Sequence, residues 1–274
     1  MPAATRNDVD LASGFNETQI IETLLAQFRA AGFPNPYDYQ PSTATGTNRY
    51  IVYEFINDAT KTKGRVYFRV RWVVNATTGA ITFYSQLFDG WNLSTKTGTN
   101  GGTEITCSLV VSITPVPLET VAINHPEVRG VWLRQGSTLG WLVFIKPINL
   151  INWDGVPLLD QNKQALGYIP TATDANTLYS TADTSGSTDI TGTWNLTNNV
   201  LLANKSALLN RHSIEPAPGI YPNSNTGAFL RFSNDIAVTA SSGLAVFTFF
   251  SGTGYTLIFP RGNSGLAILL PAKT

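Results

Sequence analysis

Charged side chains are scarce in this chain. Asp, Glu, Lys and Arg make up 13% of its 274 residues, about half the share of roughly 25% that is usual in soluble proteins. The 18 basic residues balance the 18 acidic ones. A net charge of zero provides no electrostatic attraction to nucleic acid or to an anionic membrane surface. It also removes charge repulsion between copies, which favours assembly. We therefore expect no nucleic-acid partner.

Cysteine and long apolar runs are also lacking. The single cysteine, Cys107, excludes an internal disulfide framework. No apolar run approaches the ~18 residues that a membrane-spanning helix needs. The first 15 residues contain no apolar segment of the kind found in secretion signals. These absences predict a chain that folds in a reducing cytoplasm and does not insert into a membrane.

Residues suited to catalysis or to metal binding are few. The chain has two histidines, His125 and His212, and neither has a second histidine or a cysteine at ligand spacing, so we interpret both as ordinary surface or loop residues. Phosphate-binding, dinucleotide-binding, serine-hydrolase and zinc-protease motifs do not occur. The sequence therefore predicts no enzyme, no cofactor and no metal site.

Two similar segments, QLFDGWNL and INWDGVPL, place Asp89 and Asp154 beside a glycine and a tryptophan. A pair of carboxylates could serve a glycosidase. Asp-Gly is also a favoured turn dipeptide, and a neighbouring tryptophan usually packs in the core. We favour the turn interpretation, and keep a carbohydrate-stacking role for Trp91 or Trp153 as an alternative.

What the chain does contain begins with one well-defined helix, NETQIIETLLAQFRAAGF, at residues 16–33. Asn16 is a natural N-cap, and Gln19 three residues later completes a capping box. Gly32 suits the left-handed position after the helix, and Pro34 prevents continuation. The apolar residues fall within an arc of about 140°, so one face must be buried. That face contains Ile20, Ile21, Leu24, Leu25, Phe28 and Ala31.

The sequence leaves open what buries this face. One interpretation is that the helix covers an open edge or face of the first sheet. The other is that it docks on a second copy or another subunit, carried by a turn-rich linker at residues 34–48 that spans up to about 50 Å when extended. Our functional hypothesis rests on the second interpretation. Its docking residues are Ile20, Ile21, Leu24, Leu25 and Phe28.

After residue 48 the sequence is typical of strands and turns. Residues 49–56, 64–74, 80–88 and 104–113 are predicted strands, and in 64–74 the apolar and polar side chains alternate. Residues 129–148 form a second predicted hairpin. A polar, Thr-rich stretch follows, and short strands with glycine-containing turns resume near residue 228. This pattern predicts a mainly β fold of antiparallel sandwich or barrel domains with one N-terminal helix.

Three regions follow from this pattern. Residues 1–48 are predicted to be an N-terminal helical arm and linker, residues 49–151 a first β-domain, and residues 152–274 a second β-domain with Thr-rich loops. Within the first β-domain, Arg65, Arg69 and Arg71 share one strand face. They would form a docking strip for an acidic partner or glycan. The alternative, which we favour, is a solvated face on which the arginines pair with acids on neighbouring strands, such as Glu54.

The helix, the 66–92 hairpin VYFRVRWVVNATTGAITFYSQLFDGWN and the Thr/Ser-rich middle resemble virion structural proteins of tailed bacteriophages in style, across the whole chain. The resemblance implies a tail, baseplate, fibre or capsid-decoration protein that folds in the host cytoplasm and enters the virion. Its partners would be other copies of itself, other virion proteins and, in host attachment, a surface glycan. It would have no cofactor and no catalytic activity. The alternative function is a lectin-like, carbohydrate-binding β-sandwich, with Trp91, Trp153 or Tyr179 as stacking platforms.

Overall fold

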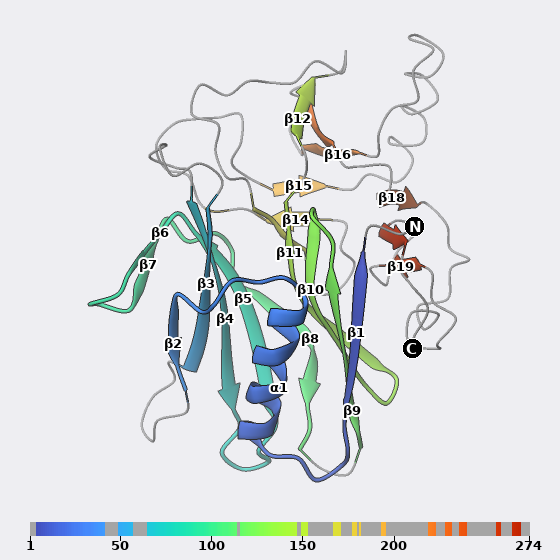
Figure 1. Cartoon of the computed structure of the whole chain (residues 1–274). Helices are drawn as coiled ribbons and strands as arrows, with labels where there is room; N and C mark the ends of the chain where they lie inside the picture. Colours follow the sequence, from blue (N-terminus) through green and yellow to red (C-terminus); the bar gives the residue numbers. More distant parts are fainter. Residues whose placement is uncertain are drawn as a thin grey trace.

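The structure of the chain is a computed structural model of residues 1–274. It describes residues 4–41, 49–56, 65–113, 116–146, 167–170, 179 and 181, together with the backbone of the strands β12 and β14–β20. The described part is mainly β, its sheets are antiparallel, and it contains one helix, α1. This confirms the predicted fold class, although the sheets stay open and do not close into a barrel (Figure 1).

Two sheets face each other around one apolar core. The first has the order β1-β9-β10-β11, with β1 at Thr5–Leu11, β9 at Leu118–Asn124, β10 at Val128–Gln135 and β11 at Thr138–Ile145. The second has the order β2-β3-β4-β5-β8, with β2 at Asp38–Gln40, β3 at Arg49–Ile56, β4 at Arg65–Val74, β5 at Ile81–Phe88 and β8 at Ile105–Val111. A separate hairpin pairs β6 (Gly90–Asn92) with β7 (Thr97–Thr99).

The predicted alternation along β4 is confirmed. Phe68, Val70 and Trp72 are fully buried in the main core, whereas Arg65, Arg69 and Arg71 lie on the opposite face. The rings of Phe55 on β3 and Phe144 on β11 stack in parallel at 4.2 Å and join the two sheets. On one side of the sandwich, the hydroxyl of Ser108 on β8 donates a hydrogen bond of 2.6 Å to the carbonyl of Leu139 on β11.

The remaining strands, which are short, form two further sheets. One has the order β12-β17-β16-β15-β14-β13, and the other β18-β20-β19. Their bounds are Asn149–Asn152 (β12), Ile169–Pro170 (β13), Thr177–Tyr179 (β14), Thr193–Asn195 (β15), Gly219–Pro222 (β16), Ala228–Arg231 (β17), Ile236–Thr239 (β18), Thr256–Ile258 (β19) and Gly265–Leu269 (β20). β12, which falls within the predicted first β-domain, pairs with β17. The rest of the predicted second domain lies largely outside the described residues, and its boundary stays a prediction.

The helix α1 (Glu17–Ala30) has the predicted ends. The side chain of Asn16 accepts a hydrogen bond from the backbone of Gln19, and the side chain of Gln19 accepts one from the backbone of Asn16. Gly32 has a φ of +77° and follows the last turn. These local signals are strong because each satisfies backbone groups that a helix end leaves unpaired.

The apolar face of α1 is buried by its own chain. Figure 1 shows the helix lying along the opening between the two sheets, with β1 on one side and β3 and β4 on the other. Ile20, Ile21, Leu24 and Phe28 are at most 4% exposed and belong to the main core, and Leu25 packs against it partly buried. The ring of Phe28 contacts those of Tyr53 and Phe68, with centroids 5.2 and 6.4 Å apart.

This packing corrects the prediction that the five docking residues bind another polypeptide. An amphipathic stripe indicates that a face is buried, but it does not indicate which chain buries it. Residues 5–40 are likewise not a separate arm. β1 pairs with β9, and β2, which falls within the predicted linker, pairs with β3. The alternative, a helix that covers an opening of its own sheets, is the one the structure supports.

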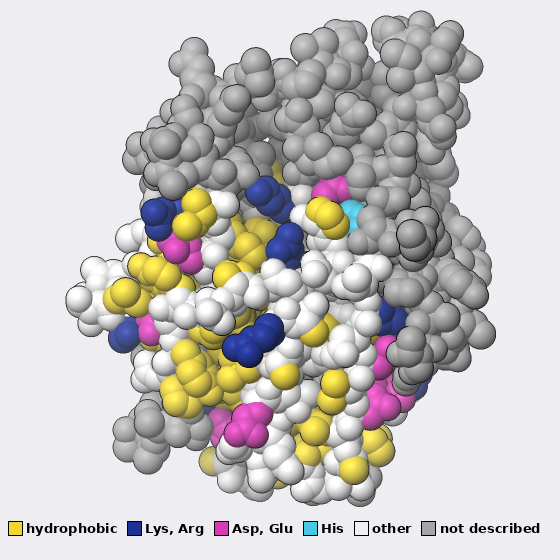
Figure 2. All heavy atoms as spheres, viewed as in Figure 1, with side chains coloured by type: hydrophobic (Ala, Val, Ile, Leu, Met, Phe, Trp, Pro, Cys, Tyr) yellow, Lys and Arg dark blue, Asp and Glu magenta, His cyan; other side chains and the backbone are white. Residues whose placement is uncertain are grey.

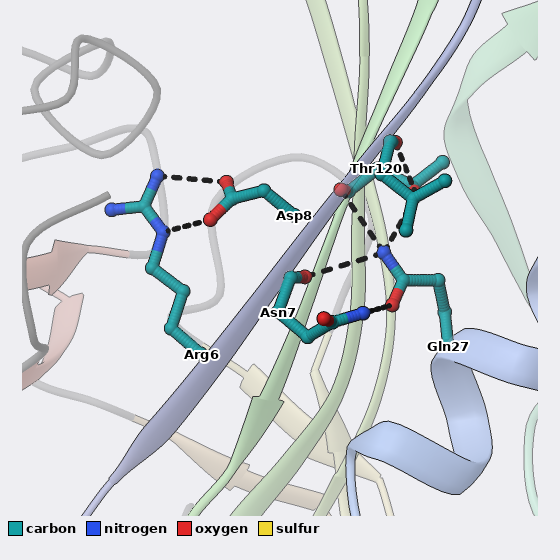
Figure 3. Close-up of polar contacts among 6 residues, drawn as sticks. Arg6, Asn7, Asp8, Gln27 and Thr120 are labelled. Carbon is teal, nitrogen blue, oxygen red and sulfur yellow. Dashed lines mark hydrogen bonds and ion pairs between the residues drawn. The ribbon is translucent and has the colours of Figure 1, made fainter. Parts of the chain in front are cut away.

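A buried polar network fixes the position of α1 against the first sheet (Figure 3). The side-chain amide of Gln27, which is fully buried, donates to the hydroxyl of Thr120 on β9 at 2.8 Å and to its carbonyl at 3.1 Å. The Gln27 carbonyl accepts from the Asn7 side chain on β1 at 2.6 Å. At the other end of the helix, the Trp72 indole donates to Glu17 at 2.8 Å. Polar contacts therefore tie the helix to both sheets.

Candidate binding surface

The outer face of the second sheet, which points away from the main core, carries polar and aromatic side chains. Alternate residues of three neighbouring strands contribute to it. We call this the outer face and define it by Tyr50, Val52, Glu54, Arg65, Tyr67, Arg69, Arg71, Tyr84, Gln86 and Phe88. Figure 2 shows the side of the molecule that carries α1, where the basic side chains lie apart among acidic, apolar and other ones.

The three arginines of the predicted docking strip pair with two carboxylates of their own chain. Arg65 forms an ion pair of 2.6 Å with Glu54 on β3. Arg69 and Arg71 share the carboxylate of Glu104, which directly precedes β8, each at 2.7 Å. These ion pairs are the pairing within the chain that we favoured, and the use of Arg65, Arg69 and Arg71 as a strip for an acidic partner stays a prediction. Glu54 was named in advance, but Glu104 was missed because it is separated from the arginines by more than 30 residues.

Aromatic rings hold these guanidinium groups in place. The guanidinium carbon of Arg71 lies 4.0 Å from the centroid of Tyr84, and that of Arg69 lies 5.0 Å from the centroid of Phe88. Burial alone would raise the pKa of Glu104, but the hydrogen bonds and charges of Arg71 and Arg69 outweigh it, so the pKa lies below its usual value. The cluster is therefore ionised at neutral pH, and its two guanidinium groups and one carboxylate leave a net charge of +1.

A second cluster is centred on Asp38 of β2, a carboxylate that is only 8% exposed. One of its oxygens accepts hydrogen bonds from the Tyr50 hydroxyl at 3.0 Å and from the Trp91 indole at 2.8 Å. The other accepts from the Lys96 ammonium at 2.9 Å. Burial would raise the pKa of Asp38, but the bonds from Lys96, Trp91 and Tyr50 lower it below its usual value. An ionised carboxylate that already accepts three hydrogen bonds is suited to a structural role and not to proton transfer.

The sequence interpretation missed Asp38 because its segment is rich in turn-forming residues. β2 is three residues long, too short for its alternation to be recognised. The segment does contain the pattern YDYQ, in which an acid lies between two tyrosines.

The β6–β7 hairpin covers part of the outer face. Trp91 of the hairpin packs with four buried residues of the sheet, Tyr50, Val52, Tyr67 and Phe88, and Tyr37 lies against the edge of this group. We call these residues the aromatic patch. The ring of Trp91 meets those of Tyr50 and Phe88 edge-on, at 5.4 and 5.6 Å between centroids. Trp91 is only 8% exposed, so the closed hairpin does not offer it as the stacking platform that a lectin-like function requires.

The other sequence-predicted residues do not join this surface. His125 lies in the loop between β9 and β10, as one of the two predicted settings has it, but it is 1% exposed and its Nδ1 accepts a hydrogen bond from the backbone of Glu127, so it is not a surface residue. Asp89 lies at the bend between β5 and β6, and its carboxylate accepts a hydrogen bond from Asn100 at the other end of the hairpin. Tyr179 packs partly buried against the main core. Trp153, Asp154 and His212 lie outside the described residues.

In the part of the chain that the structure describes, no group of three or more His, Cys, Asp or Glu side chains could hold a metal ion. None of the described helices is long and apolar enough to cross a membrane. Comparisons of the chain with protein-family models, with curated proteins and with solved structures give no match.

Proposed function

We propose that this chain is a non-catalytic structural component of a tailed-phage particle, associated with the tail, baseplate or fibre. It folds in the host cytoplasm, enters the virion and docks there on other copies of itself or on other virion proteins. The proposal starts from the resemblance in style and composition. The docking surface, however, is the outer face and not the helix, whose apolar side is used within the chain.

The observation that carries this proposal is the contrast between the two faces of the second sheet. Its inner face is aliphatic and aromatic and belongs to the main core. Its outer face combines aromatic rings with three arginines that pair with two carboxylates of the same chain. Aromatic residues and arginine are the side chains most enriched at protein interfaces, and an arginine that already has a carboxylate partner can be covered at a lower desolvation cost than an unpaired one.

The experiment is to purify the phage particles whose genome encodes this chain and to identify their proteins by mass spectrometry. We expect peptides of this chain in gradient-purified particles, in a fixed ratio to the major capsid protein, after a wash at high salt. Salt should not strip it, because the outer face carries little net charge. Peptides found only in the soluble fraction of the lysate would overturn the proposal.

One observation favours a second function, carbohydrate binding. Tyr84 presents a ring beside the hydrogen-bonding groups of Arg71 and Glu104, and sugars are bound by such mixtures of rings and polar groups. A glycan array probed with the wild-type chain and with Tyr84→Ala separates the two functions. Binding that Tyr84→Ala abolishes supports attachment to a host glycan. No binding to any glycan leaves subunit docking as the only proposed role.

A further inference from the structure

The β6–β7 hairpin is attached to the second sheet differently from every other strand near it. β6 and β7 pair with each other and, within the described residues, with no strand of the five-stranded sheet. A backbone bond from Gly102 to the carbonyl of Leu87 closes the base of the hairpin. Beyond this base, the contacts that the structure describes between the hairpin and the sheet are made by side chains. A segment with few backbone bonds to its neighbours can open locally without unfolding the rest.

Two of these side-chain contacts meet at one carboxylate. Trp91 on β6 and Lys96 in the turn both donate to Asp38, which lies on β2 at the edge of the sheet. The third donor, Tyr50 on β3, belongs to the sheet itself and not to the hairpin. Asp38 therefore connects the hairpin to the sheet through both side chains. We call the contacts of Asp38 with Trp91 and Lys96 the latch. Burial and Asp38 raise the pKa of the Tyr50 hydroxyl, and the positive charge of Arg69 on β4 opposes this rise.

The hairpin is shaped to lie flat on Phe88. A Cβ atom on Gly98 would come within 2.1 Å of the Phe88 ring, and one on Gly101 within 2.7 Å. The ring of Trp91 packs on the same Phe88 from β6. Only glycine can bring the backbone of the hairpin so close to the ring, so Gly98 and Gly101 permit the closed position of the hairpin.

The turn of the hairpin has a backbone that lysine rarely adopts. Lys96 has a φ of +57°, in the left-handed region that usually takes glycine or asparagine. The side chain of Asn92 stabilises the preceding turn by accepting from the backbone of Ser94 and Thr95. The strained position brings the Lys96 ammonium to Asp38, which is consistent with a turn held closed by this ion pair.

From this geometry we propose that residues 89–102 form a strap, which opens as a unit when Asp38 releases Trp91 and Lys96, and so exposes the aromatic patch beneath it. Opening uncovers Tyr50, Val52, Tyr67 and Phe88 and frees the indole of Trp91. The use of this patch as a docking site rests on the proposed function. The opening itself is a property of the fold of this chain and is tested without a particle.

Hydrogen–deuterium exchange on the full-length chain tests the strap. We compare the wild type with Asp38→Asn and with Lys96→Met, which removes the charge from the strap side and leaves β2 unchanged. Glu54→Gln is the matched control, because it alters an ion pair on the same outer face that does not touch the strap. In both latch variants we expect the amides of residues 90–99 to exchange at least tenfold faster, while those of β9 and β10 stay as protected as in the wild type.

Two results would overturn the strap. One is that residues 90–99 exchange together with β9 and β10 in every variant, which would make them part of the same cooperative unit. The other is equal acceleration in Glu54→Gln. If Asp38→Asn fails to fold, Lys96→Met decides alone. Failure of the strap and failure of the proposed function are distinguishable, because exchange measures the first and the protein content of purified particles measures the second.

Discussion

The side-chain amide of Gln27 on α1 is hydrogen-bonded to both the hydroxyl and the carbonyl of Thr120 on β9, more than 90 residues further along the chain. Thr120 in turn donates from its hydroxyl to the carbonyl of Val9 on β1. Moving the helix away from the sheets would therefore expose the apolar core and break this network in one step. This relationship makes α1 a structural part of the sandwich and not a detachable arm.

Replacing Gln27 with alanine should destabilise the chain by about 1–3 kcal/mol, because it removes a buried partner of Thr120 and leaves unfilled space. Gln19→Ala is the matched control. Gln19 is exposed and forms one capping bond, so its loss should cost under about 1 kcal/mol. Urea unfolding followed by circular dichroism measures both values. Equal losses in the two variants would contradict the role of the network.

Leu24 and Leu25 are adjacent in sequence but differ in burial. Leu24 is 1% exposed, whereas Leu25 is only partly buried. We expect Leu24→Ala to lower the free energy of unfolding by about 2–5 kcal/mol, and Leu25→Ala by clearly less. The two unfolding curves, measured side by side, check this. If Leu25→Ala proved the more harmful substitution, the face of the helix that the core buries would be wrongly assigned.

The two ion pairs that Glu104 forms with Arg69 and Arg71 should make the free energy of unfolding depend on pH in the acid range. The pKa of Glu104 is lowered in the folded chain from an ordinary value of 4.5. The ionised Glu104 therefore contributes fully to the free energy of unfolding above about pH 4.5, and this contribution is lost as the pH falls through the lower pKa of the folded chain. The wild type should be more stable than Glu104→Gln at neutral pH, by about 1 kcal/mol because the cluster is partly exposed.

This difference should shrink below about pH 4.5 and should stay constant between pH 6 and 8. Unfolding free energies of the two proteins across the pH range provide the measurement. Glu22→Gln, which changes an exposed glutamate of α1, serves as the control and should track the wild type. A difference that grew as the pH fell would have the wrong sign for a lowered pKa.

Cys107 should not react in the folded chain. Burial raises the pKa of its thiol to about 11, and its side chain lies in the main core. The reactive thiolate is therefore scarce and out of reach of a reagent at pH 8. We expect no labelling by a thiol-specific reagent in native buffer, and complete labelling in urea. Fast labelling of the native chain would show that β8 opens far more readily than its packing against β11 implies.

Local signals predicted the local structure well. The cap residues Asn16 and Gln19 and the alternation along β4 each report on contacts within a few residues, and both predictions are confirmed. β1 and β9 were missed because their pairing joins residues more than 100 positions apart. Gln27 was placed outside the apolar face of the helix, although it is fully buried, because its hydrogen-bond partners are distant in sequence. Long-range polar contacts leave no periodic pattern in the sequence from which they could be predicted.

In the proposed function the outer face, and not the helix, contacts a neighbouring subunit. Hydroxyl-radical footprinting of the free chain and of the purified particle can distinguish these two surfaces. We predict that Tyr84 on the outer face and Leu93 in the strap, which is 46% exposed in the free chain, become protected in the particle. Exposed residues of α1 should stay equally reactive in both samples. Protection confined to α1, with Tyr84 and Leu93 unchanged, would contradict the account.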